Sequence, residues 1–175
     1  MERWSRRLLP LLSLILIALL APSAAADTTA AAHVEIGWQV LPYQSLAVEN
    51  PSSTSSGRFR LGQPTPADLS LGYAEADGAV TLVAASNVPW SVKVHAVETD
   101  LGRSADGTSV KPLSDFLLRA NGGAYLPIST VDQTLASGAF GVTSLVVDCR
   151  ILTNSTSYRP GDYGLTLVYT ITTQD

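Results

Sequence analysis

The most constraining feature of the sequence is an alternation of apolar and polar residues with a period of two. It is clearest in Trp90–Glu98 (WSVKVHAVE), where positions 90, 92, 94 and 96 are apolar and the intervening positions 91, 93 and 95 are polar. Successive side chains of a β-strand point to opposite faces, so such a segment packs one face on a core and leaves the other in water. No segment keeps the i, i+3, i+4, i+7 stripe of an amphipathic helix for three turns. The sequence therefore predicts an all-β chain.

The predicted strands are short and are separated by Gly, Pro, Asn and Asp, the residues of turns. Further apolar or alternating segments lie at 69–76, 79–86, 116–118, 125–128, 133–136, 142–152 and 163–172. With a first strand near the N-terminus, we expect roughly eight to ten strands in an antiparallel β-sandwich of Ig-like or jelly-roll type. Phe116–Ala120 is compatible with one helical turn, and no longer helix is predicted.

The clearest predicted hairpin spans Leu69–Ser86 (LSLGYAEADGAVTLVAAS). Asp77-Gly78 has the composition of a two-residue turn that accepts positive φ and matches the twist of the flanking strands. A turn centred there pairs Ala76 with Ala79 and Tyr73 with Leu82, and it places apolar side chains together on one face. The sequence therefore predicts one hairpin, with one strand before and one strand after the turn at Asp77-Gly78.

The first 26 residues have the three parts of a secretory signal peptide. Arginines supply a positive start, residues 8–20 are almost entirely apolar, and residues 24–26 are small, as a cleavage site requires. The apolar run is shorter than the ~20 residues that span a bilayer. We therefore expect cleavage after residue 26, secretion to the cell surface or the periplasm, one β-sandwich domain over 27–175, and no membrane span in the mature chain.

The charge and the cysteine count exclude further classes. Of 11 basic and 15 acidic residues, three and one lie within residues 1–26, so residues 27–175 carry a net charge of about −6. An acidic surface repels phosphate, which argues against nucleic-acid binding. The single cysteine, Cys149, is in phase with Leu145, Val147 and Ile151, which predicts a buried thiol. The alternative for an odd cysteine is pairing between molecules.

The segment after the cleavage site leaves two alternatives open. Residues 34–48 are predicted as the first strand, with Val34, Ile36, Trp38 and Val40 on its apolar face, and a Ser- and Pro-rich loop or tether follows at 50–57. The strand can complete the sheet of its own chain, which the usual pairing of consecutive strands favours. It can also be donated to a neighbouring subunit by β-augmentation, because the tether lets it move. Uncovered, it would be an aggregation hazard.

Residues that carry catalysis or bind metals are sparse. His95 is predicted on the polar face of its strand near Lys93, and no Gly-x-Ser-x-Gly motif supports a triad around it. Glu98, Asp100 and Asp106 share a Gly-containing loop of a kind that can wrap Ca²⁺, but the EF-hand spacing is absent, which favours a plain turn. One Cys and two His do not indicate zinc. We therefore expect no enzyme, and no catalytic, metal or cofactor residue.

Aromatic residues provide a second functional hypothesis, glycan binding. Trp38 and Trp90 are in phase with Val and Ile, which predicts core packing. Tyr125 (GGAYLP) and Tyr158 (TSYRPG) lie next to loops and are the candidate surface rings. These two tyrosines are the candidate contact residues for a glycan or another ligand.

Two segments carry a resemblance to a class of proteins. The last segment, RPGDYGLTLVYTITTQD, resembles the closing strand of secreted bacterial β-sandwich surface proteins, such as WxL-type cell-wall domains and pilin-like subunits, and SNVPWSVKV is similar to an Asn-x-Pro-Trp strand of uncharacterised exported proteins of this kind. The resemblance implies a sandwich at the bacterial surface. The residues themselves predict that Gly161 permits a tight turn and that the Tyr163 hydroxyl binds the backbone, as in a tyrosine corner.

Together these features predict an exported, noncatalytic β-sandwich with a structural or adhesive role at the bacterial cell surface. Its expected partners are other copies of itself or other surface proteins, and self-assembly by strand donation is the specific form of that hypothesis. The alternative is a glycan- or ligand-binding module with Tyr125 and Tyr158 at its surface. A hydrolase with an unrecognised site around His95 is the third hypothesis.

Overall fold

The computed structural model describes residues 32–49, 59–153 and 158–174. It divides the chain into two units, one ending at Gln39 and one beginning at Val40. In the first unit, residues 32–39 are exposed and carry neither helix nor strand. The expected signal peptide (1–26) and the Ser- and Pro-rich tether (50–57) lie outside the described residues.

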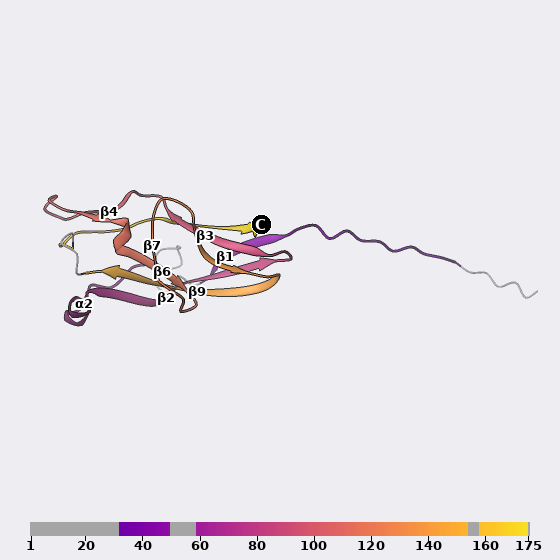
Figure 1. The fold of residues 1–175 in the computed structure, drawn as a ribbon, viewed down its shortest axis with the longest axis horizontal. Coiled ribbons are helices and arrows are strands. Elements are labelled where there is room, and N and C mark those ends of the chain that lie inside the picture. The colour runs from indigo at the N-terminus through magenta and orange to yellow at the C-terminus, as the bar shows by residue number, and fades with distance from the viewer. Residues whose placement is uncertain (1–31, 50–58, 154–157, 175) are drawn as a thin grey trace, which may run out of the picture. The chain divides into compact units, whose positions relative to one another are not determined.

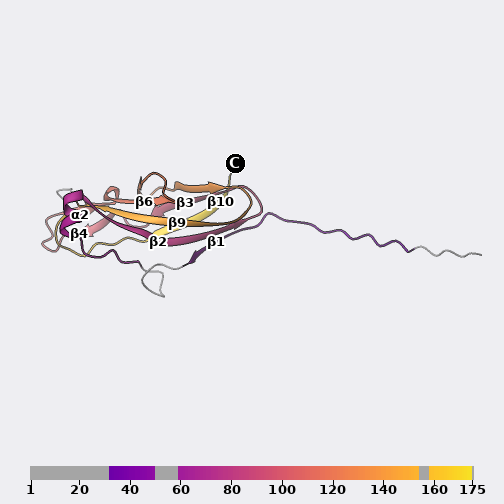
Figure 2. The ribbon, with the colours of Figure 1, turned by 90° about the horizontal axis from the view of Figure 1, so that it is seen from below.

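The second unit is an antiparallel β-sandwich, which confirms the predicted fold class. Its strands are β1 (Gln44–Glu49), β2 (Tyr73–Ser86), β3 (Trp90–Ala96), β4 (Asp100–Arg103), β5 (Val110–Pro112), β6 (Phe116–Ala120), β7 (Leu126–Pro127), β8 (Gln133–Gly138), β9 (Gly141–Leu152) and β10 (Leu167–Thr173). One sheet has the order β1-β2-β9-β6-β7 and the other β10-β3-β8, while β4 and β5 form a separate hairpin. In Figure 1 and Figure 2, α2 (Pro66–Leu71) and β4 lie at the end of the sandwich opposite the end of β10.

The core lies between the two larger sheets and follows the period-two pattern. In β3, Trp90, Val92, Val94 and Ala96 are at most 2% exposed, while the residues between them are partly exposed. From the opposite sheet, β9 contributes Leu145, Val147 and Cys149, so the prediction of a buried thiol is confirmed. These side chains interlock closely: a Cβ at Gly138 would lie 2.6 Å from the Trp90 ring, so only glycine leaves room for the indole there.

The first strand is shorter than predicted, because it begins at Gln44 and not at Val34. Gln44 pairs with Ser86, which is the last residue of β2 before the turn through Asn87 and Pro89. Residues before Gln44 therefore have no ladder partner on this sheet. Alternation is necessary for a half-buried strand, but a strand also needs a neighbour of matching length.

The hairpin predicted at Asp77-Gly78 is wrong. These residues lie inside one continuous strand, β2, and form a bulge between Ala76, which pairs with Cys149, and Val80, which pairs with Val147. Gly78 has a φ of 60°, the positive value that the sequence suggested, but it serves a bulge and not a turn. The cause is β9, whose 12 residues are long enough to pair with β2 on both sides of the bulge.

Short helices replace two expected strand or loop segments. The helix α2 carries a capping box, in which the Thr65 hydroxyl accepts from the Asp68 N–H and the Asp68 carboxylate accepts from the Thr65 N–H, and Gly72 ends it with a φ of 83°. A 3₁₀ turn, η1 (Leu113–Asp115), directly precedes β6. Phe116–Ala120, for which a helical turn was one expectation, is strand β6 and pairs with β9.

The closing segment forms the predicted tyrosine corner before β10 begins. The Tyr163 hydroxyl donates to the Arg159 carbonyl, four residues upstream, at 2.8 Å. Gly161 lies so close to the β4 strand and its loop that a Cβ would be 3.0 Å from the Arg103 carbonyl oxygen. β10 itself starts at Leu167, later than the predicted start at Tyr163.

Candidate functional site

The sandwich is only partly covered along the side where β1 and β10 lie. Each is an edge strand of its sheet, and the two strands are neighbours in space. The inward-facing Leu46, Leu167, Tyr169 and Ile171 pack against the core but stay partly exposed, whereas their counterparts on the central strand β3 are almost fully buried. Val48, which pairs with the fully buried Leu82, is 54% exposed. This open side, defined by β1 and β10, leaves apolar surface and a sheet edge accessible.

Two polar side-chain atoms on the open side are buried and lack hydrogen-bond partners within the described part of the chain. They are the Tyr169 hydroxyl on β10 and the Gln44 Nε2 on β1. Burial raises the pKa of Tyr169 well above its ordinary value, so the hydroxyl stays protonated. Buried polar groups are normally paired, and an unpaired one costs about 1–3 kcal/mol. The open side therefore offers unused hydrogen-bonding capacity next to its apolar surface.

The four predicted donor positions are fully presented to solvent. Val34, Ile36, Trp38 and Val40 are 70–89% exposed, and none of them lies in a strand. Large apolar side chains are rarely left exposed together in one segment of seven residues, since their burial is worth roughly 1.5–3 kcal/mol each. The expectation that Trp38 packs in the core is therefore wrong for the structure described, whereas Trp90, 1% exposed, fits it.

The residues between this segment and β1 are held by one side chain. The Asn87 side-chain amide donates to the Leu41 carbonyl at 2.8 Å, and its Oδ1 accepts from the Tyr43 N–H at 2.7 Å. The Asn87 N–H also donates to the Tyr43 carbonyl. Residues 41–43 are thereby fixed to the turn between β2 and β3. We call this arrangement the Asn87 clamp.

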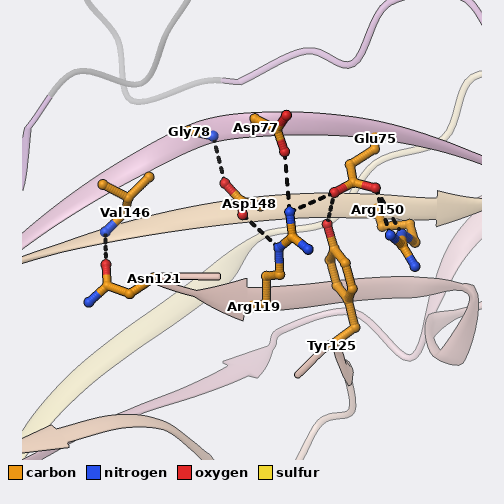
Figure 3. Close-up of polar contacts among 9 residues, drawn as sticks. All are labelled: Glu75, Asp77, Gly78, Arg119, Asn121, Tyr125, Val146, Asp148 and Arg150. Atoms are coloured by element: carbon orange, nitrogen blue, oxygen red, sulfur yellow. Dashed lines mark hydrogen bonds and ion pairs between the residues drawn. The ribbon is translucent and has the colours of Figure 1, made fainter. Parts of the chain in front are cut away.

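A second cluster of functional groups covers the outer face of the five-stranded sheet and is shown in Figure 3. The Arg119 guanidinium, on β6, donates to Asp148 at 2.7 Å, to Glu75 at 2.9 Å and to Asp77 at 3.4 Å. The Gly78 N–H, in the β2 bulge, donates to the other oxygen of Asp148 at 2.8 Å. The bulge thus aims a backbone donor at a carboxylate that lies on β9.

Glu75 links this network to a stack of aromatic rings. Its Oε2 accepts two hydrogen bonds from Arg150, and its Oε1 accepts one from the Tyr125 hydroxyl as well as the one from Arg119. The Arg150 guanidinium lies 4.0 Å from the centroid of the Tyr73 ring and 3.9 Å from that of Tyr125. Such cation–π contacts hold the rings against the sheet.

The electrostatics of this cluster favour its charged state. Burial opposes ionisation of Glu75 and Asp148, but hydrogen bonds and the neighbouring guanidinium groups outweigh it, so both pKa values lie below their ordinary values. Burial and the Glu75 carboxylate raise the pKa of Tyr125 well above its usual range. The donors and acceptors here bind one another. The cluster is therefore suited to joining β2, β6 and β9.

The two tyrosines predicted as surface rings are half-buried. Tyr125 lies in the cluster of Figure 3, between two arginines. Tyr158 lies under the Lys111 ammonium, whose Nζ is 5.0 Å from the ring centroid. Lys111 is fully buried and also donates to Asp115 and to the Leu152 carbonyl, each at 2.9 Å. The Tyr125 ring is thus occupied by two guanidinium groups, and one ammonium group lies over the Tyr158 ring. Among the described residues, the rings that are more than half exposed are instead Trp38, Tyr43 and Phe140.

The remaining candidate residues are separated from one another. His95, on the outer face of β3, contacts the Asp132 carboxylate at 2.6 Å. Glu98 accepts from the Thr166 N–H and hydroxyl, while Asp106 accepts from the Ser104 and Thr108 hydroxyls. Asp100 accepts from the Gly102 N–H. Across residues 32–49, 59–153 and 158–174, no three His, Cys, Asp or Glu side chains gather as metal ligands would.

Comparison with known proteins does not assign this chain to a family. No family model and no curated protein matches the sequence. Among solved structures, a chain from a chaperone–usher pilus, whose structure is described as revealing the molecular basis of rod uncoiling, is similar with a TM-score of 0.41 and 12% identity, over 85% of this chain and 100% of that one. The likeness is weak, and no residue role is transferred from it. None of the helices in the described ranges is long and apolar enough to cross a membrane.

Sequence reasoning missed three features of the candidate site. The Asn87 clamp had a partial signal, because Asn before a turn often bonds to nearby backbone. The charged cluster had none, because Glu75 and Arg150 are 75 positions apart. The open side could not be predicted, since the order of strands within the sheets determines which strand lies at an edge.

Proposed function

We propose that this chain is an exported, noncatalytic structural or adhesive subunit of the bacterial cell surface, which assembles by donating residues 34–40 to the sheet edge of another copy. The observation that carries the proposal is the segment with Val34, Ile36, Trp38 and Val40, in which four alternating apolar side chains are 70–89% exposed. A strand of this pattern gains backbone hydrogen bonds and apolar burial by adding to a sheet edge.

The open side is the proposed acceptor. The inward-facing positions of the last segment, Leu165, Leu167, Tyr169 and Ile171, form an alternating row that is equal in number to the donor side chains. A donated strand along β10 would cover this row and would bring side chains near the unpaired Tyr169 hydroxyl. It would therefore supply cover that the sandwich lacks along this side.

The Asn87 clamp supports donation between copies over return to the same chain. To lie beside β10 in its own sandwich, the segment that precedes β1 would have to reverse within residues 41–43. That reversal would break the bonds that Asn87 makes with Leu41 and Tyr43. Donation to a second copy keeps these bonds, because the segment can then continue away from β1.

The test uses residues 27–175 and size-exclusion chromatography with light scattering. The full chain should form oligomers whose size rises with concentration, and deletion of residues 33–40 should leave a folded monomer. A synthetic peptide of residues 33–41 should then bind the deleted protein and raise its unfolding temperature, because it binds the folded state alone. Continued assembly of the deleted protein would contradict the proposal.

Two point variants in the segment provide a matched pair. Ile36→Asp places a charge on the apolar face that would be buried, whereas Gln39→Asp places the same charge on the alternate face. We expect Ile36→Asp to abolish assembly and Gln39→Asp to retain it. Equal loss in both variants would indicate a general effect of charge and would count against a strand with one buried face.

A further inference from the structure

Exposed apolar side chains gather at the end of the sandwich where the N-terminal segment joins it. They are Leu41, Tyr43, Phe140 and Val142, each 58–77% exposed, and we call them the apolar pole. The ladder places them together, because Gln44 pairs with Ser86 and Ser86 with Gly141. Tyr43 and Phe140 therefore directly precede the row of paired residues Gln44, Ser86 and Gly141. Val142 lies in the adjacent row, opposite Ala85.

The outer sheet face next to the pole carries a single charged residue, Glu49, in the row farthest from the pole. The other outward positions on β1, β2 and β9 are Ser45, Ala47, Thr81, Val83, Ala85, Ser144 and Val146, and Glu49 pairs with Thr81. Further along the same face, the cluster of Figure 3 collects Glu75, Asp77, Arg119, Asp148 and Arg150. Most of the charge therefore lies away from the pole, and the two rows nearest to it, which contain Ala85 and Val83, carry no charged residue and can be desolvated at low cost.

The chain between the donated segment (34–40) and the Asn87 clamp is short, and its length limits what can cover the apolar pole. Only three peptide steps separate Val40 from Tyr43, and three residues span at most about 11 Å. Tyr43 is fixed by the Asn87 clamp. A copy that binds residues 34–40 must therefore come to within that distance of the pole. No long tether intervenes, so two bodies connected in this way are brought into contact.

We infer that the apolar pole is the second half of the subunit interface and that its occupant is the body of the copy that receives the donated segment. This inference rests on the proposed function and extends it from a strand to a body-to-body contact. In it, Phe140 and Tyr43 are anchors of the kind that carry most of the energy of an interface, namely exposed aromatic side chains that become buried on association.

The test is Phe140→Asp in the chain of residues 27–175, with association measured by sedimentation velocity. Because the residue is 77% exposed in the single chain, the unfolding midpoint should be unchanged, while the dissociation constant for assembly should rise about tenfold or more. Phe140→Ser repeats the test without a charge. Thr134→Asp is the control, since Thr134 is exposed on β8 and pairs with Lys93 away from the pole.

The peptide experiment distinguishes this inference from the proposed function. The peptide of residues 33–41 brings no body with it, so it should bind the 33–40 deletion equally well with and without Phe140→Asp. Unchanged assembly of Phe140→Asp, together with monomeric behaviour of the deletion, would overturn the inference and leave strand donation intact. Assembly that survives the deletion but is lost in Phe140→Asp would overturn both, because the pole would then associate without a donated strand.

Discussion

Lys111 is a charged residue whose burial is possible only because several partners surround its ammonium group. Its ammonium is fully buried, yet it binds the Asp115 carboxylate and the Leu152 carbonyl and lies over the Tyr158 ring. Removing a charge from water is costly, and only such a set of partners offsets the cost. The side chain therefore connects the segment around η1 to the end of β9 and to the closing segment of the chain.

We expect Lys111→Met to lower the free energy of unfolding by about 3–5 kcal/mol, because it leaves a buried carboxylate without its ammonium partner. Urea denaturation of the chain of residues 27–175 measures the change. The chain provides one matched control, since its only other lysine, Lys93, lies on the outer face of β3 and is partly exposed. Lys93→Met should change stability by less than about 1 kcal/mol. An equal loss in both variants would contradict this account of Lys111.

The Cys149 thiol has a simpler environment on the apolar face of β9. Burial, with a smaller contribution from the Asp148 carboxylate, raises its pKa to about 12, so almost no thiolate exists at neutral pH. We expect the thiol of the folded protein to resist Ellman's reagent and to react stoichiometrically in urea. Fast reaction of the native protein would show that the β2–β9 side of the core opens.

At the scale of elements, the bulge in β2 connects the sheet to its polar outer face. Gly78 adopts a positive φ there, and its N–H donates to the same carboxylate, Asp148, that accepts from Arg119. The bulge interrupts the β2–β9 ladder but provides a hydrogen bond to the cluster, so the interruption is compensated on the outer face.

Gly78→Ala should destabilise the protein by about 1–2 kcal/mol, because an L-residue is strained at this φ. A Cβ there would find only Val146 at 3.9 Å, an ordinary contact, so the effect isolates the backbone conformation. Gly62→Ala is the matched control, since nothing lies within 4 Å of its Cβ and its φ is not positive. Thermal unfolding followed by circular dichroism compares the two. A harmless Gly78→Ala would show that the bulge can relax to another geometry.

The cluster of Figure 3 should make the stability of the folded chain depend on pH in the acidic range. The folded-state pKa values of Glu75 and Asp148 lie below their ordinary values, so their contribution is complete above the unfolded-state values, near 4. It is lost as the pH falls through the lower folded-state values. We expect the urea midpoint to be flat from pH 7 to about 5 and to fall below that. The double variant Glu75→Gln, Asp148→Asn should be less stable at pH 7 and should show a shallower fall.

Whether an element can be predicted from the sequence depends on whether its bounds are determined by neighbouring residues or by a distant strand. β3 and β9 were predictable, because their alternation is uninterrupted and each has a partner along its length. The start of β1 and the role of Asp77-Gly78 were not, because both depend on where a distant strand begins or ends. The helix α2 was not predicted, and its end overlaps the start of the strand expected at 69–76, although Thr65, Asp68 and Gly72 form a local capping box and C-cap. The exposed donor segment was identified as a candidate, but its partner is not encoded locally.

At the scale of the whole molecule, the distribution of tryptophan gives a direct readout of assembly. Within residues 27–175 there are two tryptophans, of which Trp90 is 1% exposed and Trp38 is 89% exposed. If the chain assembles by the proposed strand donation, the environment of Trp38 should change and that of the buried Trp90 should not.

In the Trp90→Phe variant we expect acrylamide to quench Trp38 fluorescence strongly at low protein concentration and weakly at high concentration, where the segment is bound. Trp38→Phe, which reports on Trp90, should be poorly quenched at both concentrations. The quenching data are collected beside light scattering on the same samples. Trp38 that stays fully accessible in confirmed oligomers would contradict the donation of its segment.

The Asn87 clamp also has a mechanical consequence. A tensile force applied to residues 34–40 reaches the sandwich through Tyr43 and Gln44, at the start of β1. It then acts along the axis of β1, whose six residues are paired with Thr81–Ser86. The bonds of this ladder are perpendicular to the pull, so they are loaded in shear and must rupture together rather than one after another. The Asn87 side chain adds its own bonds at the point of entry. If residues 34–40 join two copies as proposed, we expect that junction to resist extension with the strength of a whole strand pair.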